Sequence, residues 1–318
     1  MLREPFKQAV KAYYLRQSGK VLPYGMGCAW LGREELNDRN IRQDTAVLLN
    51  AYRNGYRFFD TSMNYGESEV IVGHFLQKVP RDAVFLATKS AYIPEDASSK
   101  AAAELVQASL QDSLRRLRTP RIDLFQLHEI VTLSNILDQN GVVQVLNEAK
   151  RQGLIRYAGV TTRFVELLKD AARSGEFDSV QSYGRYNPVD QSATALYAVA
   201  DCLGVGTINA GPLAGFFTGA NPRDMQFPYF NERRERQRSA AIQLYDQCQT
   251  WGVSMRALAL QFPLRNPHID LTLTGPANSE QVASGLASLL DELDPVTWDR
   301  WEAWKDMNIG PSAYDGCE

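Results

Sequence analysis

One feature constrains the fold of this 318-residue chain more than any other: an alternation of short and long segments along nearly its whole length. A short run rich in β-forming residues is followed by a longer amphipathic run, and then by another short run. The short runs, each an expected strand, are 23–30, 57–62, 83–90, 121–128, 154–161, 177–184, 204–211 and 269–275. Strands that alternate with helices pair in parallel, because parallel neighbours need a crossover connection.

The longer runs carry helical patterning. Expected helices cover 101–118, 142–153, 232–252 and 278–293. The second ends at Gly153, which suits the position just after a helix C-terminus. The last opens with polar residues that suit a helix N-cap.

Eight strand–helix units predict a (β/α)₈ barrel, the TIM-barrel fold, with extended βα loops and formed as one domain over 1–318. The alternative, a doubly wound open sheet, calls for a GxGxxG turn after the first strand, and the sequence has none there. Residues 1–12 are an N-terminal extension that either forms an extra helix or stays loose. We expect the least regular structure in the loop 216–231 and in the tail 294–318.

Composition argues against several classes of protein. The net charge of −3 gives no basic excess for a nucleic-acid partner. No apolar run reaches the ~18 residues of a membrane span, and the N-terminus lacks the apolar stretch of a secretory signal. Cysteines 28, 202, 248 and 317 show neither CxxC nor metal-like spacing. We therefore expect a cytoplasmic protein with reduced thiols and no metal.

The segment FFDTSMNYGESE (58–69) places an acid at the end of an apolar strand and a phenol in the turn after it. Active sites of (β/α)₈ barrels lie at the C-terminal ends of the strands. Asp60 ends one expected strand, Lys89 ends the next and His128 ends the one after, while Tyr65 follows Asp60. These four side chains are expected at one barrel mouth.

Together the four residue types can transfer a proton. A buried Lys beside a Tyr favours the phenolate and should lower the pKa of Tyr65 from its usual value near ~10. Asp60 would keep Lys89 charged and in place, and His128 would position the substrate. Tyr65 can then protonate a carbonyl oxygen as hydride arrives, or deprotonate an alcohol as hydride leaves. Each residue alone has a plain structural explanation, and only their combination favours this chemistry.

Four segments look like the aldo-keto reductase superfamily: FFDTSMNYGESEVIVGHFL, FLATKS, SLRRLRTPRIDLFQLHE and GLIRYAGVTTR. The likeness runs in the family's order from 13–32, which resembles its N-terminal β-hairpin and first strand, to 275–286. It implies that the family's catalytic residues correspond to Asp60, Tyr65, Lys89 and His128.

Three more segments, 128–139, 208–218 and 257–275, look similar to the L-galactose dehydrogenase and aldose 1-dehydrogenase branch. Enzymes of that branch oxidise a sugar at its anomeric carbon with a nicotinamide cofactor. The resemblance therefore implies hydride transfer between NAD(P) and a carbonyl or alcohol, with an aldose or a similar hydroxylated compound as substrate. Two alternatives stay open: an NADPH-dependent aldehyde or ketone reductase, and a non-catalytic nucleotide-binding regulatory subunit. We expect a monomer or a small homo-oligomer.

The resemblance also implies an extended cofactor, NAD or NADP, across the barrel mouth. Thr161 and Gln181 would contact the nicotinamide. The pyrophosphate would lie against Gly211, Pro212 and Leu213, where small residues allow close approach. Gly275 and Gln281 would contact the adenosine half.

Several positions depart from the family pattern. Thr162 offers no amide where Asn is common, and Ala210 replaces an aromatic that stacks on nicotinamide. Gly275, Gln281 and Gly285 stand where NADP-using members often place Lys, Arg and Asn. A 2′-phosphate without a cation loses charge-assisted hydrogen bonds worth ~1.5–3 kcal/mol each. NAD is therefore favoured, unless another cation, such as one at position 223 in the long loop, serves the phosphate.

Substrate specificity is expected in the loops. Trp30, after the first strand, is predicted to bind the substrate together with Tyr65 and His128. Further loop candidates are Tyr92, Tyr186 and Asn187. A helically spaced tryptophan stripe at 298, 301 and 304 is best explained by packing against the barrel.

Overall fold

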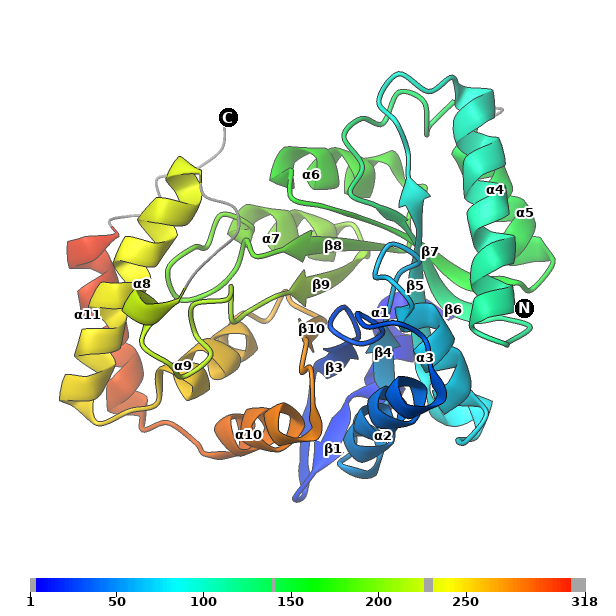
Figure 1. Cartoon of the computed structure of the whole chain (residues 1–318). Coiled ribbons are helices and arrows are strands. Elements are labelled where there is room, and N and C mark those ends of the chain that lie inside the picture. Colours follow the sequence, from blue (N-terminus) through cyan, green and yellow to red (C-terminus); the bar gives the residue numbers. More distant parts are fainter. Residues whose placement is uncertain (1–3, 139–140, 226–230, 310–318) are drawn as a thin grey trace.

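The computed structural model describes residues 4–138, 141–225 and 231–309, and its strands close into a parallel eight-stranded barrel (Figure 1). The order around the barrel is β10-β3-β4-β5-β6-β7-β8-β9, so the chain winds once around the sheet and β10 closes it against β3. The strands are β3 (Tyr24–Gly27), β4 (Phe58–Asp60), β5 (Phe85–Tyr92), β6 (Ile122–His128), β7 (Ile155–Thr162), β8 (Ser179–Tyr183), β9 (Gly206–Ala210) and β10 (Leu271–Thr274). The predicted fold and all eight predicted strands are confirmed.

Helices surround the strands, and α8 lies beside α11 at one side of the barrel (Figure 1). The connecting elements are α2 (Asp38–Arg53), α3 (Ser68–Leu76), η2 (Arg81–Ala83), α4 (Ser99–Arg116), α5 (Val142–Arg151), α6 (Val165–Ser174), α7 (Thr194–Cys202), η3 (Pro222–Asp224), α8 (Glu232–Trp251), α9 (Met255–Gln261), η4 (Phe262–Arg265) and α10 (Ser279–Leu290). Local signals set their ends. Asn278 caps α10 by accepting from the Gln281 N–H at 2.9 Å, and Gly153 follows α5 with φ +73°. None of the helices in the described ranges is long and apolar enough to cross a bilayer.

The N-terminal extension closes the barrel at the end where the strands begin. Residues of α1 (Phe6–Ala9) and η1 (Val10–Tyr13) pack on the inward-facing apolar side chains of the strands and form a plug of that end, called the plug below. The Phe6 ring is 2% exposed and meets Phe85 and Tyr157 edge-on. A Cβ at position 206 would lie 2.1 Å from Phe6 Cδ1, so this close packing requires Gly206.

The predicted N-terminal hairpin follows, as the antiparallel pair β1 (Leu15–Gln17) and β2 (Lys20–Leu22). The expectation of little regular structure in the tail is wrong, because 295–308 forms helix α11 (Pro295–Asn308). Its stripe packs inward: Trp301 and Trp304 are buried, and Trp301 Nε1 donates to Pro188 O at 3.3 Å. The end of the tail with Cys317, residues 226–230 of the long loop and residue 139 lie outside the described residues.

We expect Phe6→Ala to lower the free energy of unfolding by about 3 kcal/mol, because it removes a fully buried ring and leaves a cavity. Urea denaturation measures the change. Activity of the folded variant should stay near that of the parent, since the plug lies at the end of the barrel opposite the strand C-termini. Phe164→Ala is the matched control, because that ring is 55% exposed. Equal losses in the two variants would contradict the role of the plug.

Candidate active site

Three consecutive strands present an inward-facing ionisable side chain toward the mouth. Asp60 and His128 end β4 and β6, whereas Lys89 does not end its strand as expected, because β5 continues to Tyr92. Side chains alternate along a strand, so Asp60 shares the inner face with Phe58, and Lys89 shares it with Phe85 and Ala87. His128, the last residue of β6, is inward by the same alternation. The barrel thus brings together side chains that are far apart in sequence.

Lys89 is fully buried and its ammonium is paired. Nζ donates to Asp60 Oδ1 and to Thr61 O, the latter at 2.8 Å, while Gln126 Nε2 donates to Asp60 Oδ2 at 3.1 Å. Burial alone would lower the pKa of Lys89, but Asp60 and Tyr65 outweigh it and the pKa is raised. Lys89 is therefore a fixed positive charge at the base of the mouth.

Tyr65 lies in the loop after β4, with its ring centroid 4.8 Å from Lys89 Nζ. Burial raises the pKa of Tyr65, and Lys89 acts in the opposite direction without cancelling burial. The expectation of a net lowering is therefore wrong. Lys89 lowers the pKa of Tyr65 as predicted, but the loss of water around the phenol raises it by more. The hydroxyl is therefore held in its neutral form.

His128 stands edge-on to Tyr65, with ring centroids 5.4 Å apart. Its Nδ1 accepts a hydrogen bond from the Asn64 side-chain amide, Nδ2, at 3.2 Å and lies 2.9 Å from Ser62 Oγ. With Asn64 donating, Nδ1 is the bare nitrogen and Nε2 carries the hydrogen. Burial, with the cations Lys89 and Arg163, lowers the pKa of His128 to about 2. The imidazole is thus neutral and can donate a hydrogen bond from Nε2.

Sequence reasoning missed the residues that hold these groups in place. Asn64 and Ser62 orient the imidazole, and Gln126 steadies Asp60. A signal was present, since Ser62 and Asn64 lie between Asp60 and Tyr65, and Gln126 is two residues before His128 on the same strand face.

The predicted nicotinamide residues lie side by side, because Thr161 and Gln181 are register partners of β7 and β8. Gln181 is 3% exposed, and its Oε1 has no hydrogen-bond partner among the described residues. A buried amide oxygen is costly without a donor, so a carboxamide N–H fits here. Gly211 adopts φ +71°, and a Cβ at this position would lie 3.0 Å from the Tyr183 ring. These observations fit the bound nicotinamide nucleotide that the family implies.

Across the mouth, Gly275 follows β10 and the Trp30 indole packs against it, with Cδ1 3.4 Å from where a Cβ would stand. Trp30 is 62% exposed, so it is no core residue, and it stands beside the expected cofactor path. Gln281 Oε1 accepts from the Ala277 N–H at 2.8 Å within its own loop. Pro212 and Leu213 follow Gly211 in the turn after β9, where Leu213 O accepts from the Phe216 N–H.

Among the loop aromatics, the Tyr92 ring lies 4.9 Å from His128 and belongs to the mouth. Tyr186 and Asn187 do not: both are buried, and Tyr186 packs on Phe262 of η4. That substrate-pocket expectation is wrong, because the chain turns outward after β8 and carries these residues into the barrel–helix core. In the ranges that the structure describes, no three His, Cys, Asp or Glu residues form a metal-like group.

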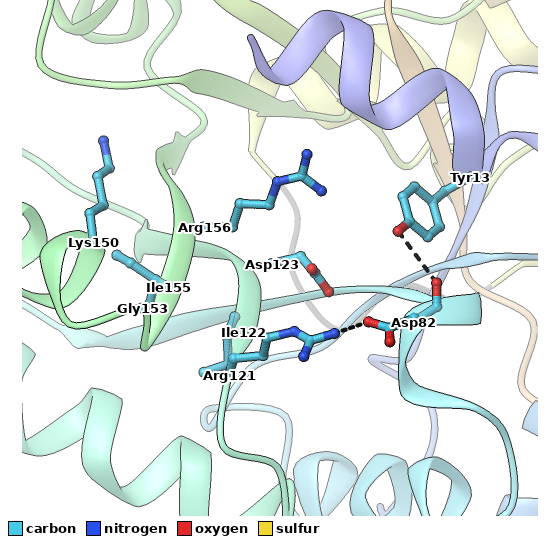
Figure 2. A pocket seen from close by; sticks show the side chains of 9 residues that line it. All are labelled: Tyr13, Asp82, Arg121, Ile122, Asp123, Lys150, Gly153, Ile155 and Arg156. Atoms are coloured by element: carbon cyan, nitrogen blue, oxygen red, sulfur yellow. Dashed lines mark hydrogen bonds and ion pairs between the residues drawn. The ribbon is translucent and has the colours of Figure 1, made fainter. Parts of the chain in front are cut away.

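Two cavities lie away from this mouth. One, of about 570 Å³, is lined by residues of α8 and α11. The other, of about 370 Å³, lies where β5, β6 and β7 begin, opposite the site (Figure 2). Its charged lining residues are each in an ion pair: Arg121 with Asp82, Asp123 with Arg81, Lys150 with Asp178, and Arg156 with Glu4. Neither cavity holds the cluster of inward-facing groups found at the mouth.

Comparison with known proteins gives the class. The model of the Aldo/keto reductase family matches residues 24–306. L-galactose dehydrogenase of Arabidopsis thaliana is 30% identical over 272 residues, which is 82% of each chain, and NADH-specific methylglyoxal reductase of Escherichia coli is 28% identical over 83% of this chain and 86% of its own. The glycerol dehydrogenase AKR11B4 from Gluconobacter oxydans superimposes with a TM-score of 0.74 at 21% identity, over 96% of this chain and 99% of its own.

The chain therefore belongs to the aldo-keto reductase family. It is an NAD(P)-dependent oxidoreductase with a small-molecule substrate. The likeness to L-galactose dehydrogenase agrees with the branch that the sequence resembles, while the solved structure supports the fold alone.

The tautomer of His128 can be tested at Asn64. Asn64→Asp replaces a donor by a carboxylate that accepts from Nδ1–H, which leaves Nε2 without its hydrogen. We expect kcat to fall at least tenfold, the value of one hydrogen bond of about 1.4 kcal/mol in the transition state. Asn64→Ala removes the donor without imposing the other tautomer and should cost less. Equal kcat values for the two variants would refute this orientation.

The charge state of His128 can be followed by NMR. With a pKa of about 2, its ring signals should stay constant from pH 8 to pH 5. The unfolded chain binds a proton at this histidine below about pH 6.5, so folding stability should fall as the pH drops through that value. A His128 titration near pH 6.5 would show that the imidazole is not held neutral.

Proposed function

We propose that this enzyme oxidises an aldose or a similar hydroxylated substrate with NAD. The observation that carries the proposal is the contact network of Asp60, Lys89, Tyr65 and His128 at one barrel mouth. Support for the sugar comes from the likeness to L-galactose dehydrogenase, whose name states its substrate. The complete network also argues against a non-catalytic regulatory subunit.

In this proposal each residue has one task. A nicotinamide held at the mouth would supply the hydride acceptor or donor. His128 Nε2–H holds the substrate oxygen, and Tyr65 takes the hydroxyl proton as the carbon loses hydride, which leaves a carbonyl product. Lys89 stabilises the phenolate that must form before or during this transfer, and Asp60 keeps Lys89 charged and fixed.

Residues proposed to hold the cofactor are Thr161 and Gln181 for the carboxamide, Gly211 to Leu213 for the pyrophosphate, and Gly275 with Gln281 for the adenosine half. The preference for NAD rests on the missing cations at positions 275 and 281. Arg223, the cation considered as a substitute, makes a bidentate ion pair with Asp246 at 2.8 and 2.7 Å, so it is already engaged.

A second candidate is the reduction of an aldehyde or ketone. The raised pKa of Tyr65 favours it, because a neutral phenol is ready to donate a proton to a carbonyl oxygen. The relative named as a methylglyoxal reductase acts in that direction and is named as NADH-specific. The same residues serve both directions.

Initial rates with a panel of aldoses, measured with NAD and NADP in parallel, test the function. An NAD-dependent rate with one aldose, at least tenfold above the NADP rate, is expected. Consumption of reduced cofactor with simple aldehydes, and no rate with any aldose, would reject the sugar and leave the reductase.

Tyr65→Phe should abolish turnover, a loss of at least about 100-fold, because the variant has no group to transfer the proton. Cofactor affinity, measured by quenching of intrinsic fluorescence, should change little. Tyr13→Phe, at the closed end of the barrel, is the matched control. Turnover close to that of the parent would remove Tyr65 from its proposed role.

A further inference from the structure

Beside His128, two oppositely charged residues follow neighbouring strand ends. Glu129 comes directly after β6, and Arg163 comes directly after β7. These strands are in register at His128 and Thr161. Arg163 Nε lies 3.5 Å from Glu129 Oε2. The pair therefore stands next to the imidazole that is proposed to hold the substrate oxygen.

The backbone at Glu129 is strained. Its φ of +49° lies in the left-handed region, which disfavours residues other than Gly, Asn and Asp. The turn lets the Ile130 N–H donate to Thr161 O at 3.2 Å, which joins the two strand ends. Strained residues gather at functional sites. A glutamate where Gly would relieve the strain points to a use for the carboxylate itself.

The pair lies where β6 and β7 end, at the mouth of the barrel. Burial raises the pKa of Glu129, while the cations Arg163, Lys89 and Arg185 oppose that rise. Arg163 and Lys89 also lower the pKa of His128. The Arg163 guanidinium also lies 5.6 Å from the centroid of the Tyr183 ring, which packs over Gly211 at the same mouth. Arg163 thus lies at the mouth, and Glu129 is paired with it.

The pair also keeps hydrogen-bonding capacity. A separation of 3.5 Å is at the outer limit for an N–H···O bond, and it involves one of the five guanidinium N–H groups. The Arg163 side chain is 61% exposed and that of Glu129 is 26% exposed. One small patch therefore offers donors and acceptors side by side, open to an incoming molecule.

We propose that Glu129 and Arg163 bind the hydroxyl groups next to the reacting carbon, an inference that rests on the proposed oxidation of a hydroxylated substrate. One hydroxyl of a vicinal diol donates to the carboxylate, and the other accepts from the guanidinium. Because the two charges cancel, the patch offers hydrogen bonds to a neutral polyol-like substrate and no net positive charge for a sugar acid or sugar phosphate. An analogue without hydroxyls leaves both groups unpaired.

The test compares glyceraldehyde with propanal, its analogue without hydroxyls, in reduction with NADH or NADPH. The readout is the ratio of kcat/KM for glyceraldehyde to that for propanal. Glu129→Gln removes the charge and keeps the shape. We expect the ratio to fall at least tenfold, the value of about 1.4 kcal/mol, in Glu129→Gln and in Arg163→Gln. Glu148→Gln is the matched control, because Glu148 pairs with Arg151 on the surface of α5.

A ratio that stays at the parent value in both variants overturns the inference. Equal losses of kcat/KM for the two aldehydes also overturn it, because they would mean that the pair only braces the strand ends. If thermal denaturation shows that Glu129→Gln does not fold, Arg163→Gln gives the decisive ratio. The ratio is measured in the reductive direction, so it tests the role of the pair even if the enzyme oxidises no aldose. A lack of aldose oxidation would reject the proposed oxidation of an aldose and would leave the test of the pair unaffected.

Discussion

The buried ion pair between Lys89 and Asp60 is the interaction on which the rest of the site depends. An ammonium with no exposure to water is costly unless it is paired and hydrogen-bonded. Here Asp60 and the Thr61 carbonyl take the ammonium hydrogens, and Gln126 fixes the second carboxylate oxygen. Because the two partners lie on the neighbouring strands β4 and β5, the pairing of these strands also brings the two charges together.

That fixed charge organises the other groups by electrostatics. It raises the energetic cost of protonating His128, which together with burial keeps the imidazole neutral. It opposes burial at Tyr65, so the phenol is neutral but close to a group that stabilises the phenolate. The surroundings thus determine the protonation state of each group. His128 is a neutral donor, Tyr65 is a phenol that can transfer a proton, and Lys89 is a permanent cation.

Stability and chemistry occupy opposite ends of the barrel. At the end where strands begin, the Phe6 plug and stacked aromatics such as Phe58 and Phe85 fill the interior. At the other end, polar groups with open hydrogen-bonding capacity face the mouth, among them Gln181 and the Glu129–Arg163 pair. This separation is general for the fold, since loops at the strand C-termini can vary without disturbing the packed core.

The eight strands and the places of Asp60, Tyr65, Lys89 and His128 could be predicted from the amino-acid sequence, because strand periodicity and turn positions are local patterns. Features that depend on distant neighbours and on water could be seen only in the folded chain. The net direction of the Tyr65 pKa required knowing how deeply the phenol is buried. The helix at 295–308 forms where its tryptophans find a surface, and the Glu129–Arg163 pair exists only because β6 and β7 are adjacent. A local sequence pattern contains no information on how much water a side chain loses or on which distant residues it meets, so these features could not be predicted from it.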